Sequence, residues 1–226
     1  MIAQATDAVA SMRGLWNMEI IYRDKDVVVA VKPAGVLSTD EPGGMPELLR
    51  AALEHENIRS VHRLDRVVSG LMVYALRAKA ASELSCQIRE GSFQKEYIAM
   101  VGGNLPEEGR LQHYLLRDMQ ERKTYCVPQN TPGAQAAVLT YRVLDRAPEG
   151  NVVRIRLETG RTHQIRCQFA AIGCPLVGDK KYGGAEAENI RLFSCYLGFS
   201  QPYSGERLEF ERMPPWLTVE TTGSAG

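Results

Sequence analysis

Many short stretches of this chain alternate apolar and polar residues with a period of two, the pattern of β-strands that bury one face. Residues 152–157 show it most clearly, with the sequence VVRIRL. Turn residues such as Asp24-Lys25-Asp26 separate neighbouring stretches. The pattern predicts about ten strands, over residues 19–22, 27–31, 71–76, 93–101, 111–116, 123–127, 136–144, 152–157, 192–199 and 207–210.

A period of four residues marks the clearest helix, residues 79–90, because Ala80, Leu84 and Ile88 fall on one side of it. Gly91 follows as a C-terminal stop. Elsewhere the patterns are weaker. They predict helices over 46–55, with Pro46 at its start, and over 162–172, with Thr162 as its cap, and loops over 61–70 and 173–184.

The strands follow one another in runs and rarely alternate with helices. This order favours an α+β fold with a mixed, mainly antiparallel sheet and flanking helices over a doubly wound fold. The chain has 226 residues, of which 44% are hydrophobic, enough for a substantial core. Since no repeat, low-complexity tract or linker divides it, we expect one domain over residues 19–226, preceded by a loosely ordered arm, residues 1–18.

Composition excludes only a few classes of function. Twenty-seven basic and 27 acidic residues give a formal net charge of zero, so charge alone predicts no partner. Five cysteines without a C-x-x-C pair are expected to be buried free thiols of a cytoplasmic protein. Four scattered histidines predict no metal site, and the absence of a long apolar run or an N-terminal signal pattern predicts no membrane association.

Residues 62–70 (HRLDRVVSG) form the first segment that is rich in functional groups. Asp65 stands between Arg63 and Arg66, and nearby guanidinium groups favour an ionised carboxylate. An ionised, positioned carboxylate is what covalent attack on a sugar carbon requires. From this segment alone, an exposed aspartate in a surface ion pair is the better explanation.

Residues 157–166 (LETGRTHQIR) form the second segment, which has the features of an anion-binding corner. Gly160 permits a sharp turn, and the free N–H groups of a helix start attract negative charge. Arg161 and Arg166 add forked donors that suit phosphate or carboxylate. A capped helix with a solvated basic face explains the segment equally well, and His163 alone is more typical of a structural histidine.

Together these segments resemble the RluA-type pseudouridine synthases, over residues 20–199. The resemblance implies the pseudouridine synthase fold with a central active-site cleft. It also implies isomerisation of uridine to pseudouridine in RNA, without metal or cofactor. Two positions depart from the family pattern, since Val68 stands where threonine is usual and Gln201 where histidine is frequent. The motifs that carry the resemblance are KPAG at 32–35, HRLD at 62–65 with SG at 69–70, KEY at 95–97, GRTHQIR at 160–166 and GDKKYG at 178–183.

The resemblance also implies roles for individual residues. Asp65 is expected to be the catalytic aspartate, acting as a nucleophile at the sugar or assisting elimination from it. Tyr97 is expected to stack on the target uracil and to be a candidate for the proton transfer at C5, and Arg166 to pair with Asp65. The remaining expected contacts with substrate RNA are Arg63, which fills the space of the flipped nucleotide or grips its phosphate, Ile165, which packs against the base, and His62, Arg161 and Lys32.

We expect a monomer that recognises a compact RNA target, such as a stem-loop of ribosomal or transfer RNA, and that binds neither DNA nor membranes. A non-catalytic RNA-binding module that kept the fold is a competing hypothesis, and the complete set of Asp65, Tyr97 and Arg166 argues against it. A metal-dependent phosphoester hydrolase using His62 and Asp65 is a third hypothesis. The shortage of further metal ligands near these two residues argues against it.

Overall fold

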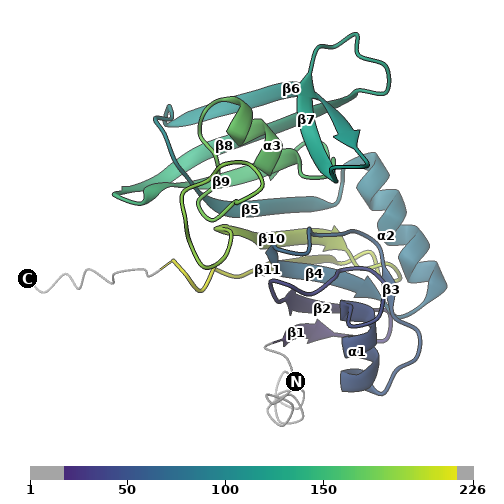
Figure 1. The fold of residues 1–226 in the computed structure, drawn as a ribbon. Coiled ribbons are helices and arrows are strands. Elements are labelled where there is room, and N and C mark those ends of the chain that lie inside the picture. Colours follow the sequence, from purple (N-terminus) through teal and green to yellow (C-terminus); the bar gives the residue numbers. More distant parts are fainter. Residues whose placement is uncertain (1–17, 218–226) are drawn as a thin grey trace, which may run out of the picture.

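The computed structural model describes residues 18–217, in which eleven strands form one sheet (Figure 1). The predicted N-terminal arm therefore lies outside the described residues, except for Met18. The strands are β1 (Glu19–Arg23), β2 (Val27–Lys32), β3 (Arg59–Ser60), β4 (Ser69–Ala75), β5 (Gln94–Val101), β6 (Glu108–Asp118), β7 (Lys123–Val127), β8 (Gln135–Ala147), β9 (Gly150–Leu157), β10 (Leu192–Ser200) and β11 (Arg207–Glu211), and the helices are α1 (Met45–Leu53), α2 (Ala78–Glu90) and α3 (Gln164–Ala171).

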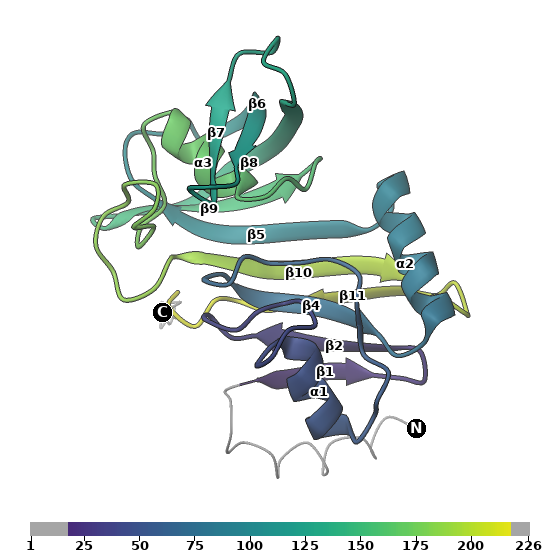
Figure 2. The same cartoon turned by 45° about the vertical axis from the view of Figure 1, so that its right-hand side comes forward.

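The strands are arranged in the order β1-β2-β4-β10-β5-β9-β8-β6-β7, while β11 pairs with β10 and β3 pairs with β4. Neighbours are antiparallel except for β4 and β10, which are parallel. Figure 2 shows the hairpin β6–β7 rising above β5 and β9, and α1 and α2 beside the part of the sheet that contains β4 and β10. The predicted α+β class with a mixed, mainly antiparallel sheet is confirmed.

Alternating residues of the central strands build a separate core on each face of the sheet. In β2, Val28 and Ala30 belong to one buried cluster and Val27 and Val29 to another. The first cluster also contains residues of α1 and α3, and the second contains residues of α2. Helices α1 and α3 therefore cover one face and α2 the other. The candidate site lies on the face of α1 and α3.

The predicted strands and helices are all present, with corrections at some boundaries. Strand β3 has only two residues, too few for a periodic pattern to predict, and β4 begins at Ser69, inside the predicted loop 61–70. Helix α3 begins at Gln164, so Thr162 is not its cap. His163 has φ 55°, a left-handed conformation, and no side chain caps the helix start. The helical backbone therefore cannot extend back through His163 to Thr162.

Gly70 is the position where β4 and β10 meet. Its φ is 124°, and a Cβ atom there would lie 2.4 Å from the backbone nitrogen of Ser194. Only glycine allows the two parallel strands to come this close. This approach fixes the end of the loop that carries Asp65.

The five cysteines are free thiols. Cys167, Cys174 and Cys195 are buried as predicted, whereas Cys86 and Cys126 are only half-buried. None of the helices within residues 18–217 is long and apolar enough to cross a membrane.

Candidate active site

Asp65 lies on the loop between β3 and β4, and hydrogen bonds hold this loop in place. The hydroxyl of Ser38 donates to the carbonyl of Leu64 (2.7 Å) and accepts from its N–H (3.2 Å). Gly35 N–H donates to the carbonyl of Arg66 (2.8 Å), and Arg66 Nε donates to the carbonyl of Gly35 (2.8 Å). The loop is therefore fastened on both sides of Asp65 to the turn that follows β2.

The carboxylate of Asp65 meets Arg166 of α3. Arg166 Nη1 donates to Asp65 Oδ2 at 3.0 Å, and the side chain of Asp65 remains 17% exposed. The other edge of the guanidinium is occupied by Asp179, through bonds of 2.7 Å from Nε and 2.9 Å from Nη2. Burial opposes the charge of Arg166, but its bonds to Asp179 and the charge of Asp65 outweigh this effect and raise the pKa of Arg166. The pairing of Arg166 with Asp65, implied by the resemblance, is present in the structure.

His163 lies beside the same carboxylate. Its Nε2 is 3.7 Å from Asp65 Oδ2, and its Nδ1 is 2.9 Å from the hydroxyl of Tyr182. Burial lowers the pKa of His163 to about 4, against the opposing effect of Asp65, and Arg166, Arg117 and Lys181 lower it further. The ring is therefore neutral at neutral pH. Nδ1 and the hydroxyl of Tyr182 share a hydrogen bond, and the hydroxyl itself donates to the carbonyl of Thr124 (3.1 Å).

Tyr97 of β5 faces the same side of the sheet as α3. Its side chain is buried, and it is paired across the sheet with Ser194 of β10 and Ile155 of β9. Burial, followed by the charge of Asp65, raises the pKa of Tyr97, so its hydroxyl keeps its proton at neutral pH. Tyr97 thus presents an aromatic surface and a neutral hydroxyl near the carboxylate.

A cleft of about 60 Å³ brings these groups together. Arg63, Asp65, Tyr97, Arg161, Ile165 and Arg166, six of the eight site residues predicted from the sequence, line it. Arg63 and Arg161 are exposed, whereas Ile165 is buried and belongs to the same hydrophobic cluster as Tyr97. The cleft therefore combines a carboxylate, an aromatic ring and an apolar wall with two exposed cations.

Lys32 and His62, both expected to contact RNA, have hydrogen-bond partners inside the protein and lie outside the cleft. Lys32 is fully buried, and its ammonium donates to the carbonyls of Pro33 (2.8 Å), Val36 (2.7 Å) and Arg66 (3.2 Å). Burial lowers the pKa of Lys32 to about 8, and Asp65 acts in the opposite direction.

His62 accepts a hydrogen bond at Nε2 from the backbone N–H of Val73 (3.1 Å), and its ring lies 5.5 Å from that of Phe93. Burial, and secondarily Lys95, lowers the pKa of His62 well below its ordinary value. The ring of His62 thus accepts a backbone hydrogen bond from β4. Neither His62 nor Lys32 lines the cleft.

The basic stretch 154–166 does not form one basic surface. Arg154 is paired with Glu96 (2.5 Å) and Glu211 (2.8 Å), and Arg166 is buried between two carboxylates. Near the start of α3, two N–H groups have internal acceptors, since Arg161 N–H donates to Gln164 Oε1 (2.9 Å) and Gln164 N–H donates to the carbonyl of Arg161 (3.1 Å). Arg161 itself remains exposed at the rim of the cleft.

The two departures from the family pattern have different consequences. Val68 is buried, lines the cleft and packs in the same cluster as Tyr97, so its methyl groups serve the core. Gln201 lies in the turn between β10 and β11, where its Nε2 donates to Asp24 and Asp26, both at 3.0 Å. Gln201 therefore joins this turn to the β1–β2 turn and does not line the cleft.

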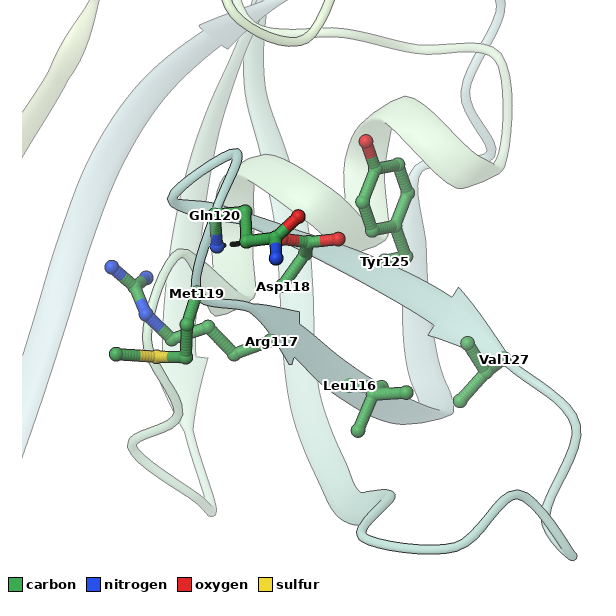
Figure 3. A pocket seen from close by; sticks show the side chains of 7 residues that line it. All are labelled: Leu116, Arg117, Asp118, Met119, Gln120, Tyr125 and Val127. Atoms are coloured by element: carbon green, nitrogen blue, oxygen red, sulfur yellow. Dashed lines mark hydrogen bonds between the residues drawn. The ribbon is translucent and has the colours of Figure 1, made fainter.

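A larger concavity of about 440 Å³ lies on the hairpin β6–β7 (Figure 3). It is lined by residues of both strands and their connection, including the exposed side chains of Met119 and Tyr125. None of the eight predicted site residues lines it. Within residues 18–217, no group of three or more His, Cys, Asp or Glu side chains is arranged to hold a metal ion.

The position of His163 predicts a pH dependence of stability. Between about pH 4 and 6.5 the unfolded chain binds a proton on this histidine that the folded protein does not bind. The free energy of unfolding should therefore fall as pH falls through this range. His163→Asn, which tolerates the left-handed backbone, should remove part of this slope in urea denaturation at several pH values. An unchanged slope would contradict the assignment of a proton-free ring in the folded state.

Comparisons with known proteins identify the family of this chain. A family model described as RNA pseudouridylate synthase matches residues 26–171. The chain is 35% identical over 206 residues to a dual-specificity RNA pseudouridine synthase RluA of Yersinia pestis, covering 86% of this chain and 98% of that protein. It is 32% identical over 244 residues to a ribosomal large subunit pseudouridine synthase D of Pseudomonas aeruginosa, covering 93% of this chain and 75% of that protein.

Among solved structures, human RNA pseudouridylate synthase domain containing 1 is similar, with a TM-score of 0.77 and 25% identity, covering 89% of this chain and 85% of that one. The chain therefore belongs to the RNA pseudouridylate synthase family. Within this family it is of the RluA type, and it is an enzyme of the isomerase class.

Proposed function

We propose that this enzyme converts uridine to pseudouridine in structured RNA, with Asp65 as the catalytic aspartate. The observation that supports this most strongly is the meeting of Asp65, Tyr97 and Arg166 in one cleft, with the carboxylate 3.0 Å from the guanidinium. In the reaction the N1–C1′ bond breaks, the uracil turns, and C5 joins C1′ with loss of the C5 proton. Asp65 either attacks C1′ or assists elimination from the sugar, and both routes need an ionised carboxylate.

The target nucleotide must leave its helix to react. A stacked base hides N1 and C1′, so an enzyme that acts on them extrudes the base into a pocket and stacks it on an aromatic side chain. Tyr97 supplies the aromatic surface, and Ile165 supplies the apolar wall. Arg63 at the rim is suited to occupy the vacated space or to hold the displaced phosphate.

The charge distribution supports a compact target. The exposed cations that line the cleft are Arg63 and Arg161, while the net charge of the chain is zero. We infer that the RNA is a stem-loop recognised mainly at the cleft. The name of one relative specifies the ribosomal large subunit, and the name of another specifies dual specificity without naming the RNA. Ribosomal and transfer RNA are both candidates here because both contain stem-loops.

We further infer that residues 19–226 act as one catalytic domain, since the described strands form a single sheet and three of its strands contribute residues to the cleft: β5, β9 and β10. One chain supplies Asp65, Tyr97 and Arg166, which supports action as a monomer. The free thiols are compatible with the cytoplasm as the site of action.

Tyr97→Phe is expected to retain most activity, whereas Tyr97→Ala should lose about 5- to 150-fold, because stacking of a base on an aromatic ring is worth about 1–3 kcal/mol. The test measures single-turnover rates on an unmodified RNA that the wild-type enzyme converts. The melting temperature of each variant is measured alongside. Equal losses in both variants would show that the hydroxyl acts in the proton transfer at C5 and that stacking is secondary.

The proposed reaction can be tested with purified protein and RNA from cells that lack the gene. Chromatography of digested nucleosides, separately for the ribosomal and transfer RNA fractions, should show one pseudouridine gained for each uridine lost. Conversion should continue in EDTA once the RNA is folded in monovalent salt. Loss of conversion in EDTA, with RNA folding intact, would show that the reaction depends on a metal ion. EDTA-sensitive strand cleavage without any pseudouridine would favour the metal-dependent hydrolase. An absence of conversion with retained RNA binding would favour the non-catalytic module.

A further inference from the structure

Asp179 is an acidic residue of the cleft region that the proposed mechanism leaves without a role. Its side chain is 1% exposed, and its two oxygens accept the Nε and Nη2 bonds of Arg166 at 2.7 and 2.9 Å. Fork-to-fork pairing of this kind fixes both the distance and the plane of a guanidinium. Asp179 therefore determines how Arg166 is oriented.

The backbone around Asp179 is held in place by the loop itself. Gly178 has φ +79°, and a Cβ atom there would lie 2.3 Å from the carbonyl oxygen of Asn189. Asp179 N–H donates to Leu176, and the carbonyl of Asp179 accepts from Tyr182 and Gly184. The carboxylate is thus placed by a loop fixed on both sides.

Arg166 is consequently left with one nitrogen, Nη1, that Asp179 does not engage. Nε and Nη2 are engaged by Asp179, the ring of Tyr182 lies 5.1 Å from Cζ, and Nη1 reaches Asp65 at 3.0 Å. Without Asp179, Arg166 would be held by a single bond to Asp65, and its guanidinium could rotate about the bonds of its side chain. The second carboxylate removes this freedom. It also leaves two negative charges to share one positive charge, so Arg166 does not fully neutralise Asp65.

We propose that Asp179 is a positioning residue: it fixes the fork of Arg166 so that Nη1 holds the carboxylate of Asp65 in its reactive orientation. The inference rests on the proposed catalytic role of Asp65. Asp179 does not line the cleft, so its expected effect on the reaction passes through Arg166.

The test compares single-turnover rates, RNA dissociation constants and melting temperatures of Asp179→Asn and the wild type. An amide cannot accept both bonds of the fork, so the rate should fall about 100-fold, as expected for a small misplacement of a reacting group. The RNA dissociation constant should stay within about threefold, since the surface that meets RNA is unchanged. Asp26→Asn is the matched control, because Asp26 is also buried in a turn but does not line the cleft. It should keep the wild-type rate.

A double mutant separates positioning from a general structural role. In Arg166→Lys the fork is absent, so adding Asp179→Asn should slow the reaction little further. A full additional 100-fold loss would overturn the proposal, as would a fall in RNA binding in parallel with the rate. A lower melting temperature alone is expected, because Asp179 is one half of a buried ion pair. If Asp179→Asn does not fold, Asp179→Glu decides, since it keeps the charge but displaces the oxygens. An unchanged rate in that variant would overturn the proposal.

The same experiment includes Asp65→Asn. If Asp65→Asn is inactive and Asp179→Asn has the wild-type rate, only the role of Asp179 fails. If Asp65→Asn keeps the wild-type rate, the proposed function fails together with the role of Asp179.

Discussion

Asp65→Asn is expected to abolish pseudouridine formation while leaving RNA affinity almost unchanged. The amide has the shape of the carboxylate and can still accept the bond from Arg166 Nη1, which is 3.0 Å long in the wild type. It has no negative charge, however, and can neither attack C1′ nor assist departure of the base. We expect a loss on the order of 10⁴-fold or more in the single-turnover rate, the size of loss seen when an enzyme loses a reacting side chain.

The measurement compares the single-turnover rate with the RNA dissociation constant of the same preparation. Asp145→Asn is a suitable control because Asp145 is an exposed aspartate of β8 that does not line the cleft. The control should match the wild type in both quantities. If Asp65→Asn loses affinity in step with activity, Asp65 anchors the RNA and does not perform the chemistry.

Arg166→Met is expected to cause the second large loss. It removes the guanidinium that joins Asp65 to Asp179 and leaves two carboxylates facing the space of the lost group. Breaking a buried ion pair by removal of one partner costs about 3–5 kcal/mol of stability. The catalytic loss should exceed about 100-fold, because the orientation of Asp65 is lost as well.

Arg166→Lys distinguishes the loss of charge from the loss of geometry. Lysine keeps a positive charge but cannot bind both carboxylates through a planar fork. Compared with Arg166→Met, we expect this variant to regain part of the free energy of unfolding but little of the activity. Urea denaturation and single-turnover rates measure the two quantities. Near wild-type activity in Arg166→Lys would show that a positive charge alone is sufficient and that the orientation of the pair is unimportant.

The strands could be predicted well because their pattern is local. In β2 and β4 successive side chains enter separate clusters on the two faces, so almost every residue of these strands is apolar. In β9 the alternation of valine and isoleucine with arginine is visible directly in the sequence. Strand β3, with two residues, has no such pattern.

Other features depend on tertiary contacts and could not be predicted from local pattern. Lys32 is the last residue of β2 and precedes a turn, a position that predicts exposure, but its ammonium is enclosed by three carbonyls from two segments of the chain. The start of α3 is shifted because His163 adopts a left-handed backbone beside Tyr182, which is 19 residues away.

The candidate site was predicted from the resemblance, not from periodicity. Asp65 and Arg166 are 101 residues apart, and no local pattern places them together. Asp179 and Tyr182 both lie within the motif GDKKYG that contributed to the resemblance, but no role was assigned to either residue. The sequence feature that indicates a role for Asp179 is its position directly after Gly178 in this family motif.

Asp65 is the residue proposed to form pseudouridine in a cellular RNA. A transcriptome-wide map of pseudouridine by carbodiimide labelling tests this role most directly, in cells that lack the gene and carry either the wild-type protein or Asp65→Asn at equal abundance. We expect particular sites, in ribosomal or transfer RNA, to be restored by the wild type and by no other rescue. Identical maps in the two rescues would contradict this role.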